Sequence, residues 1–294
     1  MNPWIEAMRL RTLPVSVAGV TAGTGCAIYH HGFSLLPMLI CLAFAVLAQI
    51  ASNFANEYYD FRNGLDRKGR AGFRRGVTEG DIQPEKMKRA TYTLLLLDAA
   101  LGCTLIIWGG WWLIPVGIAI ALFALGYSTG PYPLSHHGLG DIAVVIFFGL
   151  VPVLFTEYVQ TGVWQFASVS LCAALGVGLL AANVLIVNNY RDVDDDRAVG
   201  KRTTVVIFGR SIMAKVYLFN GIAASILFSM AGTRAPSYTS VIWVAVFGAH
   251  MILWSKLKES EGVALNQLLK FTSMLLFVAS LCLLCVLGIW PEKG

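Results

Sequence analysis

Two polar stretches place acids and amides at helical spacing directly after long apolar runs. One reads NFANEYYDFRNG and the other reads NNYRDVDDDRAVG. Side chains four residues apart on an α-helix face nearly the same way. The spacing therefore predicts two oxygen-rich helix faces, the first with Asn56 and Asp60 and the second with Asn188, Asp192 and Asp196.

Oxygen donors without a nearby Cys or His favour magnesium over zinc. Carboxylates gathered in one pocket repel one another, so they either take up protons or bind cations. Mg²⁺ typically binds one or two carboxylates together with substrate phosphates, which predicts a phosphorylated ligand. We call each of these rows of side chains, spaced four residues apart on one helix face, a ladder. We therefore expect Mg²⁺ to bind at the residues of the two ladders, Asn56, Asp60, Asn188, Asp192 and Asp196. Asp195 lies close enough in angle to assist, whereas Asp194 is expected to face away.

Basic residues near both stretches predict a diphosphate site. Lys and Arg can hold the phosphate oxygens that face away from a metal. Metal and basic side chains together stabilise the charge that develops on a leaving diphosphate. The predicted diphosphate-binding residues are Arg70, Arg75, Arg191, Lys201 and Arg202. The predicted catalytic residues are Asp60, Asp192, Asp196 and Lys201.

Each motif also has a simpler explanation. A single acidic turn such as residues 192–196 would suit a solvated helix end. The arginines of residues 70–75 could serve only to orient the chain in a membrane. Two Asn-led ladders at the same membrane face are harder to explain in this way, and ionisable groups near membrane depth are functional by default. The pair of ladders therefore favours a binding site.

Other polar residues could contact a second substrate. The candidates are Asn53, Glu57, Asp66, Tyr127, Tyr132, Asp141 and Asn183. The prolines and glycines of residues 127–141 could equally serve only to turn the chain. Asn183 lies inside an apolar run, where an amide more often forms a hydrogen bond between helices.

The rest of the chain has the composition of a membrane protein. Of its 294 residues, 56% are hydrophobic and 13% are charged, against about a quarter charged in soluble domains. Apolar runs of about 17 to 25 residues are needed to cross roughly 30 Å of hydrocarbon. They predict an all-α, polytopic membrane protein with nine transmembrane helices near 13–29, 35–55, 91–107, 111–128, 141–158, 166–188, 212–230, 238–255 and 271–290.

The distribution of Lys and Arg predicts the orientation. With nine spans and an inner N-terminus, nearly all basic residues fall in the inner segments, as expected for cytoplasmic loops. Both acidic stretches then lie on the cytoplasmic face of the cell membrane. The net charge of +5 follows from this topology, so we expect membrane lipids and no nucleic acid as partners. The N-terminus lacks the pattern of a cleavable signal peptide.

These motifs resemble those of the UbiA superfamily of intramembrane prenyltransferases. The resemblance is carried by LRTLP at 10–14, NFANEYYD at 53–60, RAGFRRG at 70–76, KMKRA at 86–90, HGLGDIAVVIFFG at 137–149 and NNYRDVDDDRAVGKRTTVV at 188–206. It implies a nine-helix bundle with a cytoplasmic-side active-site cavity. The chain would form one domain over 1–294, with an acidic motif in each half, about 1–140 and 141–294. The family usually has Asp where this chain has Glu57, which puts that carboxylate one methylene farther out.

The resemblance is strongest to the branch that prenylates 1,4-dihydroxy-2-naphthoate. It implies Mg²⁺-dependent transfer of a polyprenyl group from polyprenyl diphosphate, with loss of CO₂ and diphosphate, to give demethylmenaquinone. A phytyl or homogentisate prenyltransferase of the same superfamily is the nearer alternative. A transporter of an anionic or phosphorylated solute is the other, but transporters tend to place such charges near the bilayer midplane. Here the charges are predicted at one membrane face, which favours an enzyme.

Overall fold

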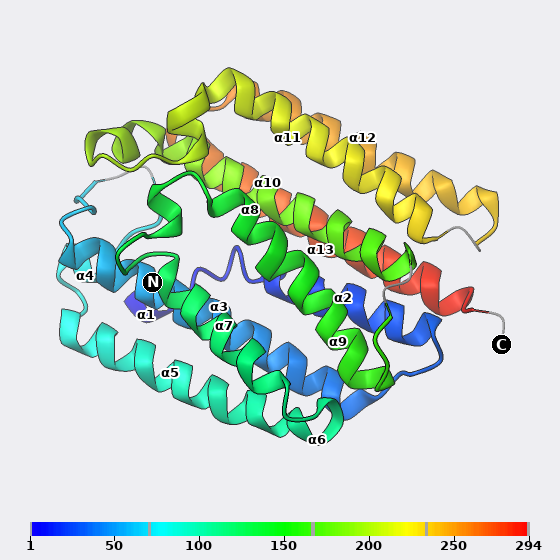
Figure 1. The fold of residues 1–294 in the computed structure, drawn as a ribbon. Helices are drawn as coiled ribbons and strands as arrows, with labels where there is room; N and C mark the ends of the chain where they lie inside the picture. Colours follow the sequence, from blue (N-terminus) through cyan, green and yellow to red (C-terminus); the bar gives the residue numbers. More distant parts are fainter. Residues whose placement is uncertain (1, 70–71, 166–167, 233–234, 293–294) are drawn as a thin grey trace.

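Long helices make up most of the structure. The computed structural model describes residues 2–69, 72–165, 168–232 and 235–292, and no β-strand occurs among them. The long helices lie roughly side by side, and the short helices and loops connect them at the two ends of the bundle (Figure 1). The prediction of an all-α fold is confirmed.

Seven helical segments of the described chain are long and apolar enough to cross a membrane, and they coincide with seven of the nine predicted spans. They are α3 (Leu35–Arg62), α5 with α6 (Pro84–Thr104 and Ile106–Gly109), the run of α8, η2 and α9 (Gly140–Val144, Val145–Leu150 and Val151–Thr161), α10 (Ser168–Ala198), α11 (Thr204–Ala231), η3 with α12 (Ser237–Thr239 and Ser240–Glu259), and η4 with α13 (Gly262–Ala264 and Leu265–Ile289).

Two further apolar helices, α2 (Pro14–Tyr29) and α7 (Leu113–Gly126), occupy the other two predicted spans but are shorter. With 16 and 14 residues, they rise only about 24 and 21 Å, less than the roughly 30 Å hydrocarbon core. Nine crossings therefore stay a prediction. The remaining short helices are α1 (Pro3–Ala7), α4 (Gly76–Glu79) and η1 (Leu134–His136).

Both acidic stretches are helical, as their four-residue spacing predicts. α3 continues to Arg62 and α10 to Ala198, beyond the predicted ends of the apolar spans. Each helix is followed closely by a glycine with positive φ, Gly64 at 67° and Gly200 at 76°. A left-handed glycine is a common way to end a helix. The ladder side chains are therefore carried on the last turns of rigid helices.

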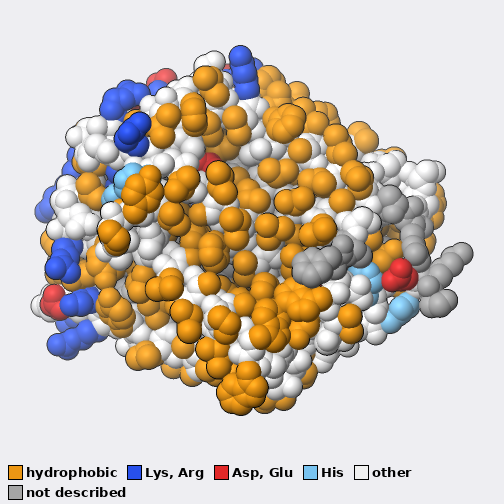
Figure 2. Space-filling view, viewed as in Figure 1, with side chains coloured by type: hydrophobic (Ala, Val, Ile, Leu, Met, Phe, Trp, Pro, Cys, Tyr) orange, Lys and Arg blue, Asp and Glu red, His pale blue; other side chains and the backbone are white. Residues whose placement is uncertain are grey.

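α10 is the buried centre of the bundle. It packs against α2, α11, α13 and η2, whereas apolar side chains of the outer helices, among them Leu96, Ile107, Leu122 and Phe219, are exposed. Hydrophobic side chains cover most of the visible face, and Lys and Arg gather at the end of the bundle where α1 and α4 lie (Figure 2). An apolar side and a basic end suit a protein embedded in lipid.

η2 and α10 approach closely through two glycines, which gives a testable consequence. A Cβ on Gly149 would lie 2.5 Å from Gly178 Cα, so Gly149→Ala forces the two helices apart. Overpacking typically costs about 1–3 kcal/mol in the free energy of unfolding, and we expect a lower unfolding temperature in detergent. Gly117→Ala on α7 is the matched control, because nothing lies within 4 Å of its Cβ position. Equal unfolding temperatures for the two variants would contradict this packing.

Candidate active site

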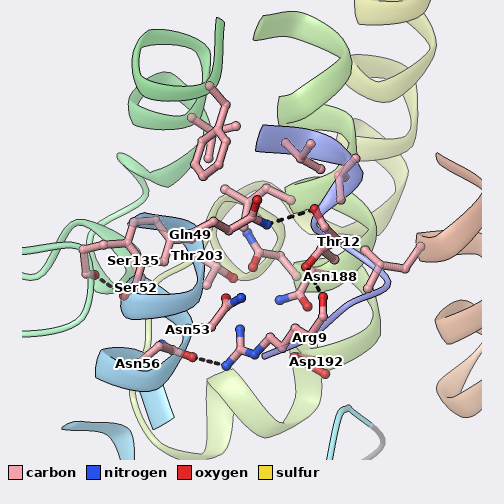
Figure 3. Close-up of a pocket in the computed structure, with 18 of the residues that line it drawn as sticks. Arg9, Thr12, Gln49, Ser52, Asn53, Asn56, Ser135, Asn188, Asp192 and Thr203 are labelled. Atoms are coloured by element: carbon pink, nitrogen blue, oxygen red, sulfur yellow. Dashed lines mark hydrogen bonds between the residues drawn. The ribbon is translucent and has the colours of Figure 1, made fainter. Parts of the chain in front are cut away.

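The two predicted oxygen-rich faces meet at one cavity of about 160 Å³. Asn53 and Asn56 on α3 lie across it from Asn188 and Asp192 on α10, with Arg9 between them (Figure 3). The predicted site residues that line the cavity are Asn53, Asn56, Asp60, Arg75, Tyr127, Asn188, Asp192, Asp196 and Lys201. Two helix ends that are far apart in the sequence thus form one polar site.

Asp60 joins the two halves of the site. Its side chain is 1% exposed, and Oδ2 accepts a hydrogen bond from Lys201 Nζ at 2.9 Å. Arg75 Nη2 lies 3.9 Å from the same oxygen, and the Asn56 amide donates to it at 3.2 Å. Two cations beside one buried carboxylate offset the cost of removing its charge from water.

Arg9 enters the cavity from the segment between α1 and α2. Its Nη2 donates to Asn56 Oδ1 at 2.5 Å, and Asn56 Nδ2 also donates to Ser128 Oγ at 3.0 Å. Arg9 has a φ of 53°, a left-handed conformation that is uncommon for residues other than glycine. Sequence reasoning did not assign Arg9 to the site, although its position directly before the LRTLP motif was an available signal.

Arg191 supports the α10 ladder from outside the cavity lining. Its Nε and Nη2 donate to the two carboxylate oxygens of Asp192 at 2.7 and 2.8 Å. Nη2 also donates to Asn188 Oδ1 at 2.9 Å, and Nη1 donates to Asn266 Oδ1 at 2.8 Å. The buried guanidinium therefore orients two ladder residues in this arrangement. The direct diphosphate contact expected of Arg191 stays a prediction.

One other predicted diphosphate residue, Arg202, is not brought into the cavity. Arg202 is exposed and does not line it, whereas the preceding Lys201 is buried and does. Arg70 lies outside the described residues.

The aspartates at the end of α10 divide by helix face, as predicted for Asp192, Asp194 and Asp196, whereas Asp195, which was expected to assist the site, does not line the cavity. Asp192 and Asp196 are buried and line the cavity. The Asp194 side chain is 72% exposed and lies 3.4 Å from Arg210, while Asp195 pairs with Arg67. The exposed pairs belong to the surface, where ion pairs contribute little to stability.

Glu57 and Asp66 lie outside the cavity lining and hold the segment that follows α3. The buried Glu57 accepts a hydrogen bond from the Val77 backbone amide at 3.0 Å. Asp66 Oδ2 lies 3.4 Å from Arg75 Nε. Both acids therefore help to position the segment that carries Arg75.

Three other predicted substrate residues do not line this cavity. Tyr132 is exposed and stacks on the His137 ring, with centroids 3.6 Å apart. Asp141 accepts a hydrogen bond from Thr204 Oγ1 at 2.7 Å. Asn183 hydrogen-bonds to α11, which matches the packing alternative for this amide. Of the predicted substrate residues between 127 and 141, Tyr127 lies in the lining.

Several polar residues of the lining were not predicted. They are Arg9, Thr12, Gln49, Ser52, Ser135, Asn189 and Thr203. Gln49 precedes Asn53 by four residues on α3, so extending the first ladder backwards would have found it. Its amide donates to the Thr12 carbonyl at 2.9 Å. Thr12, Ser135 and Thr203 come from other segments and have no spacing signal of this kind.

The donor set fits a magnesium ion better than it fits a metal held by protein groups alone. No group of three or more His, Cys, Asp or Glu that could hold a metal ion is found in the described ranges. The carboxylates of Asp60, Asp192 and Asp196 nonetheless line one cavity with amide oxygens. Asp60 Oδ1 is buried and has no hydrogen-bond partner among the described residues. Few carboxylates, amide oxygens and a bound phosphate are the usual ligands of Mg²⁺.

A second, apolar cavity of about 300 Å³ adjoins the polar one. Gln49, Ser52, Phe123 and Phe148 line both cavities. Its other walls come mainly from apolar side chains of α3, α5, α7 and the η2–α9 run. A charged cavity and a larger, mainly apolar cavity therefore lie next to each other.

The sequence matches known proteins over most of its length. The model described as "UbiA prenyltransferase family" matches residues 16–277. The chain belongs to the UbiA prenyltransferase family. Its seven apolar helical segments and this family membership identify it as an integral, multi-pass membrane protein.

Two bacterial UbiA relatives carry the same name, 1,4-dihydroxy-2-naphthoate octaprenyltransferase. The Haemophilus influenzae protein is 34% identical over 259 residues, which cover 83% of this chain and 82% of that protein. The Escherichia coli protein is 39% identical over 214 residues, which cover 70% and 68% of the two chains. A UbiA homologue from Archaeoglobus fulgidus, solved with GPP and Mg²⁺, has the same fold, with a TM-score of 0.68 at 16% identity over 96% of this chain and 99% of that one.

The pKa of the His136 imidazole depends on the charge of Lys201 in this site. Burial first, and then the positive charge of Lys201, lower the pKa of the His136 imidazole from 6.5, while Asp60 raises it. Lys201→Met removes the positive charge that lowers the pKa of His136 and leaves the carboxylate of Asp60, which raises it. We therefore expect the pKa of His136 to rise. NMR titration of labelled histidine in detergent measures it, with Lys256→Met, at an exposed position, as the control. An unchanged or lower pKa of His136 in Lys201→Met would contradict this geometry.

Proposed function

We propose that the protein transfers a polyprenyl group from a polyprenyl diphosphate to 1,4-dihydroxy-2-naphthoate, with loss of diphosphate and CO₂, to give demethylmenaquinol, the reduced form of demethylmenaquinone. The observation that carries the proposal is that a cavity lined by carboxylates, amides and cations shares four lining residues with a larger apolar cavity. A substrate with a charged head and a long hydrocarbon tail would use both. The two bacterial relatives are named for transfer to this naphthoate.

Mg²⁺ is the cofactor of the proposal. Mg²⁺ would be held, together with the diphosphate, by the five predicted ligands, because all five residues line the polar cavity: Asn56, Asp60, Asn188, Asp192 and Asp196. When bound, the ion would neutralise part of the charge of the diphosphate. The A. fulgidus homologue was solved with both Mg²⁺ and GPP, which supports this choice.

Cations of the chain would hold the diphosphate oxygens that face away from the metal. Lys201, Arg75 and Arg9 line the cavity, and Lys201 and Arg75 already lie beside Asp60. Loss of diphosphate breaks its oxygen–carbon bond to the allylic carbon, and the electron pair leaves with the diphosphate. Hydrogen bonds from these side chains stabilise the charge that develops on it.

The prenyl group would lie in the apolar cavity, where its walls exclude water. Phe123 and Phe147 stack with ring centroids 3.8 Å apart, and with Phe148 they border this cavity. Their aromatic faces are suited to an allylic cation, and the absence of water protects the cation from hydrolysis. The naphthoate carbon that carries the carboxylate attacks the cation. The carboxylate then leaves as CO₂ and returns its bonding electrons to the ring.

The proposal includes the topology expected from the sequence. We infer nine membrane crossings, with α2 and α7 completing the set, and one domain over 1–294 whose halves, about 1–140 and 141–294, each supply one ladder. The N-terminus and the polar cavity would face the cytoplasm. The gathering of Lys and Arg at the end of the bundle near α1 and α4 supports this orientation (Figure 2).

A reconstituted assay tests the reaction. The purified protein, with Mg²⁺, 1,4-dihydroxy-2-naphthoate and farnesyl or octaprenyl diphosphate, should form a prenylated and decarboxylated product that mass spectrometry detects. Chelation with EDTA should abolish turnover and added Mg²⁺ should restore it. Homogentisate is the competing acceptor. Prenylation of homogentisate alone would move the assignment to that branch, and no product with either acceptor would refute the proposal.

Variants of two aspartates on α10 test which side chains of this helix belong to the site. Asp192 lines the polar cavity, whereas Asp194 is exposed. We expect Asp192→Ala to lower kcat by at least about a hundredfold, since a cavity carboxylate acts on the charge of the transition state. Asp194→Ala should stay within about twofold of the wild type. Similar activities of the two variants would contradict the assignment of the α10 ladder.

A further inference from the structure

A carboxyl group lies in the wall of the apolar cavity. Asp98 on α5 is 4% exposed, and it is the one acidic or basic residue in the lining of this cavity, as far as the chain is described. Its Oδ1 is buried without a hydrogen-bond partner among the described residues. A polar group in this position costs stability, and intramembrane carboxyls are functional by default. The polar site described above does not use it.

Asp98 lies between the polar site and the far part of the apolar cavity. Tyr92, six residues earlier on α5, meets the hydroxyl of Tyr59 at 2.8 Å. Since Tyr59 adjoins Asp60, Asp98 lies about 9 Å along α5 from the level of Asp60, near the level of Asn53 on α3. The cavity continues past it along Gly102, Cys103 and Ile106. A hydrocarbon chain that starts at the polar site therefore reaches Asp98 before the far part.

We propose that Asp98 is a specificity-determining residue that limits how far a prenyl chain extends into the apolar cavity. The proposal rests on the proposed function, because the diphosphate must be anchored at the polar site. A chain that passes Asp98 places hydrocarbon against a carboxyl whose Oδ1 has no protein partner, and it displaces any water that could serve as one. A chain that ends before Asp98 does not incur this cost. Each isoprene unit therefore adds to affinity up to Asp98 and adds little beyond it.

A chain-length series tests the proposal. Dissociation constants and kcat/KM are measured for geranyl, farnesyl, geranylgeranyl and octaprenyl diphosphate with the full-length protein in detergent and Mg²⁺. For the wild type we expect both to level off with increasing length. Asp98→Leu should raise the preference for the longest over the shortest substrate by roughly tenfold, since it removes an unsatisfied buried polar group. Asp98→Asn keeps a polar group of similar size and should retain the wild-type preference.

Ile106→Phe is a matched control that does not depend on the stability of the Asp98 variants. Ile106 lines the far part of the cavity, so this change narrows the space beyond Asp98. It should leave the wild-type length preference unchanged and should reverse the gain of Asp98→Leu in the double variant. A loss of long-chain affinity from Ile106→Phe alone would overturn the proposal, because the chain would then already occupy the far part.

The outcomes distinguish this inference from the proposed function. If Asp98→Leu changes all chain lengths equally, Asp98 is only a structural residue and the inference is wrong, while naphthoate prenylation stands. If the length preference of the dissociation constants shifts as expected but naphthoate is not prenylated, the inference stands and the acceptor assignment fails. If no prenyl diphosphate binds, both are wrong.

Discussion

The structure depends on burying acidic side chains of two helices, which are far apart in the sequence, in the lining of one cavity. Carboxylates of α3 and α10 face the same cavity, where water is limited and their mutual repulsion is strong. Lys201 and Arg75 beside Asp60, and Arg191 beside Asp192, supply the compensating charge. Because Arg75 and Lys201 come from the segments after α3 and α10, these connecting segments must fold over the helix ends. The same charges are then available to a diphosphate and its metal.

A second constraint is that the polar cavity lies next to an apolar cavity. The polar cavity and the apolar cavity share Gln49, Ser52, Phe123 and Phe148, so the proposed substrate would change from electrostatic contacts to dispersion contacts within a few residues of α3. This arrangement suits the proposed chemistry, in which a cation forms where diphosphate leaves and must be kept from water. Asp98 stands out in this setting, because it is the one acidic or basic residue that lines the apolar cavity in the part of the chain that the structure describes.

Much of the site could be predicted because helical spacing is a local property. The ladders of Asn56 with Asp60 and of Asn188 with Asp192 and Asp196 follow from the 3.6-residue turn, and all five residues line the cavity. Arg9 could not be placed in this way, since its contact with Asn56 depends on how the segment before α2 folds back. The direction of Arg191 away from the lining depends on Asn266, at the start of α13. Spacing carries no information about either contact.

The sequence by itself determined the all-helical membrane architecture and the two oxygen-rich helix faces, because composition and periodicity act within single segments. Its motifs, through their resemblance to those of known proteins, also indicated the family. Only the tertiary structure decided which segments meet. It brought Lys201 to Asp60, took Tyr132, Asp141 and Asn183 out of the polar lining, and set Asp98 in the wall of an apolar cavity. Such contacts join residues that are remote along the chain, so they depend on how the whole bundle packs. The spacing of residues in the sequence therefore indicates which side chains could form a site, and the packing of the helices determines which of them meet.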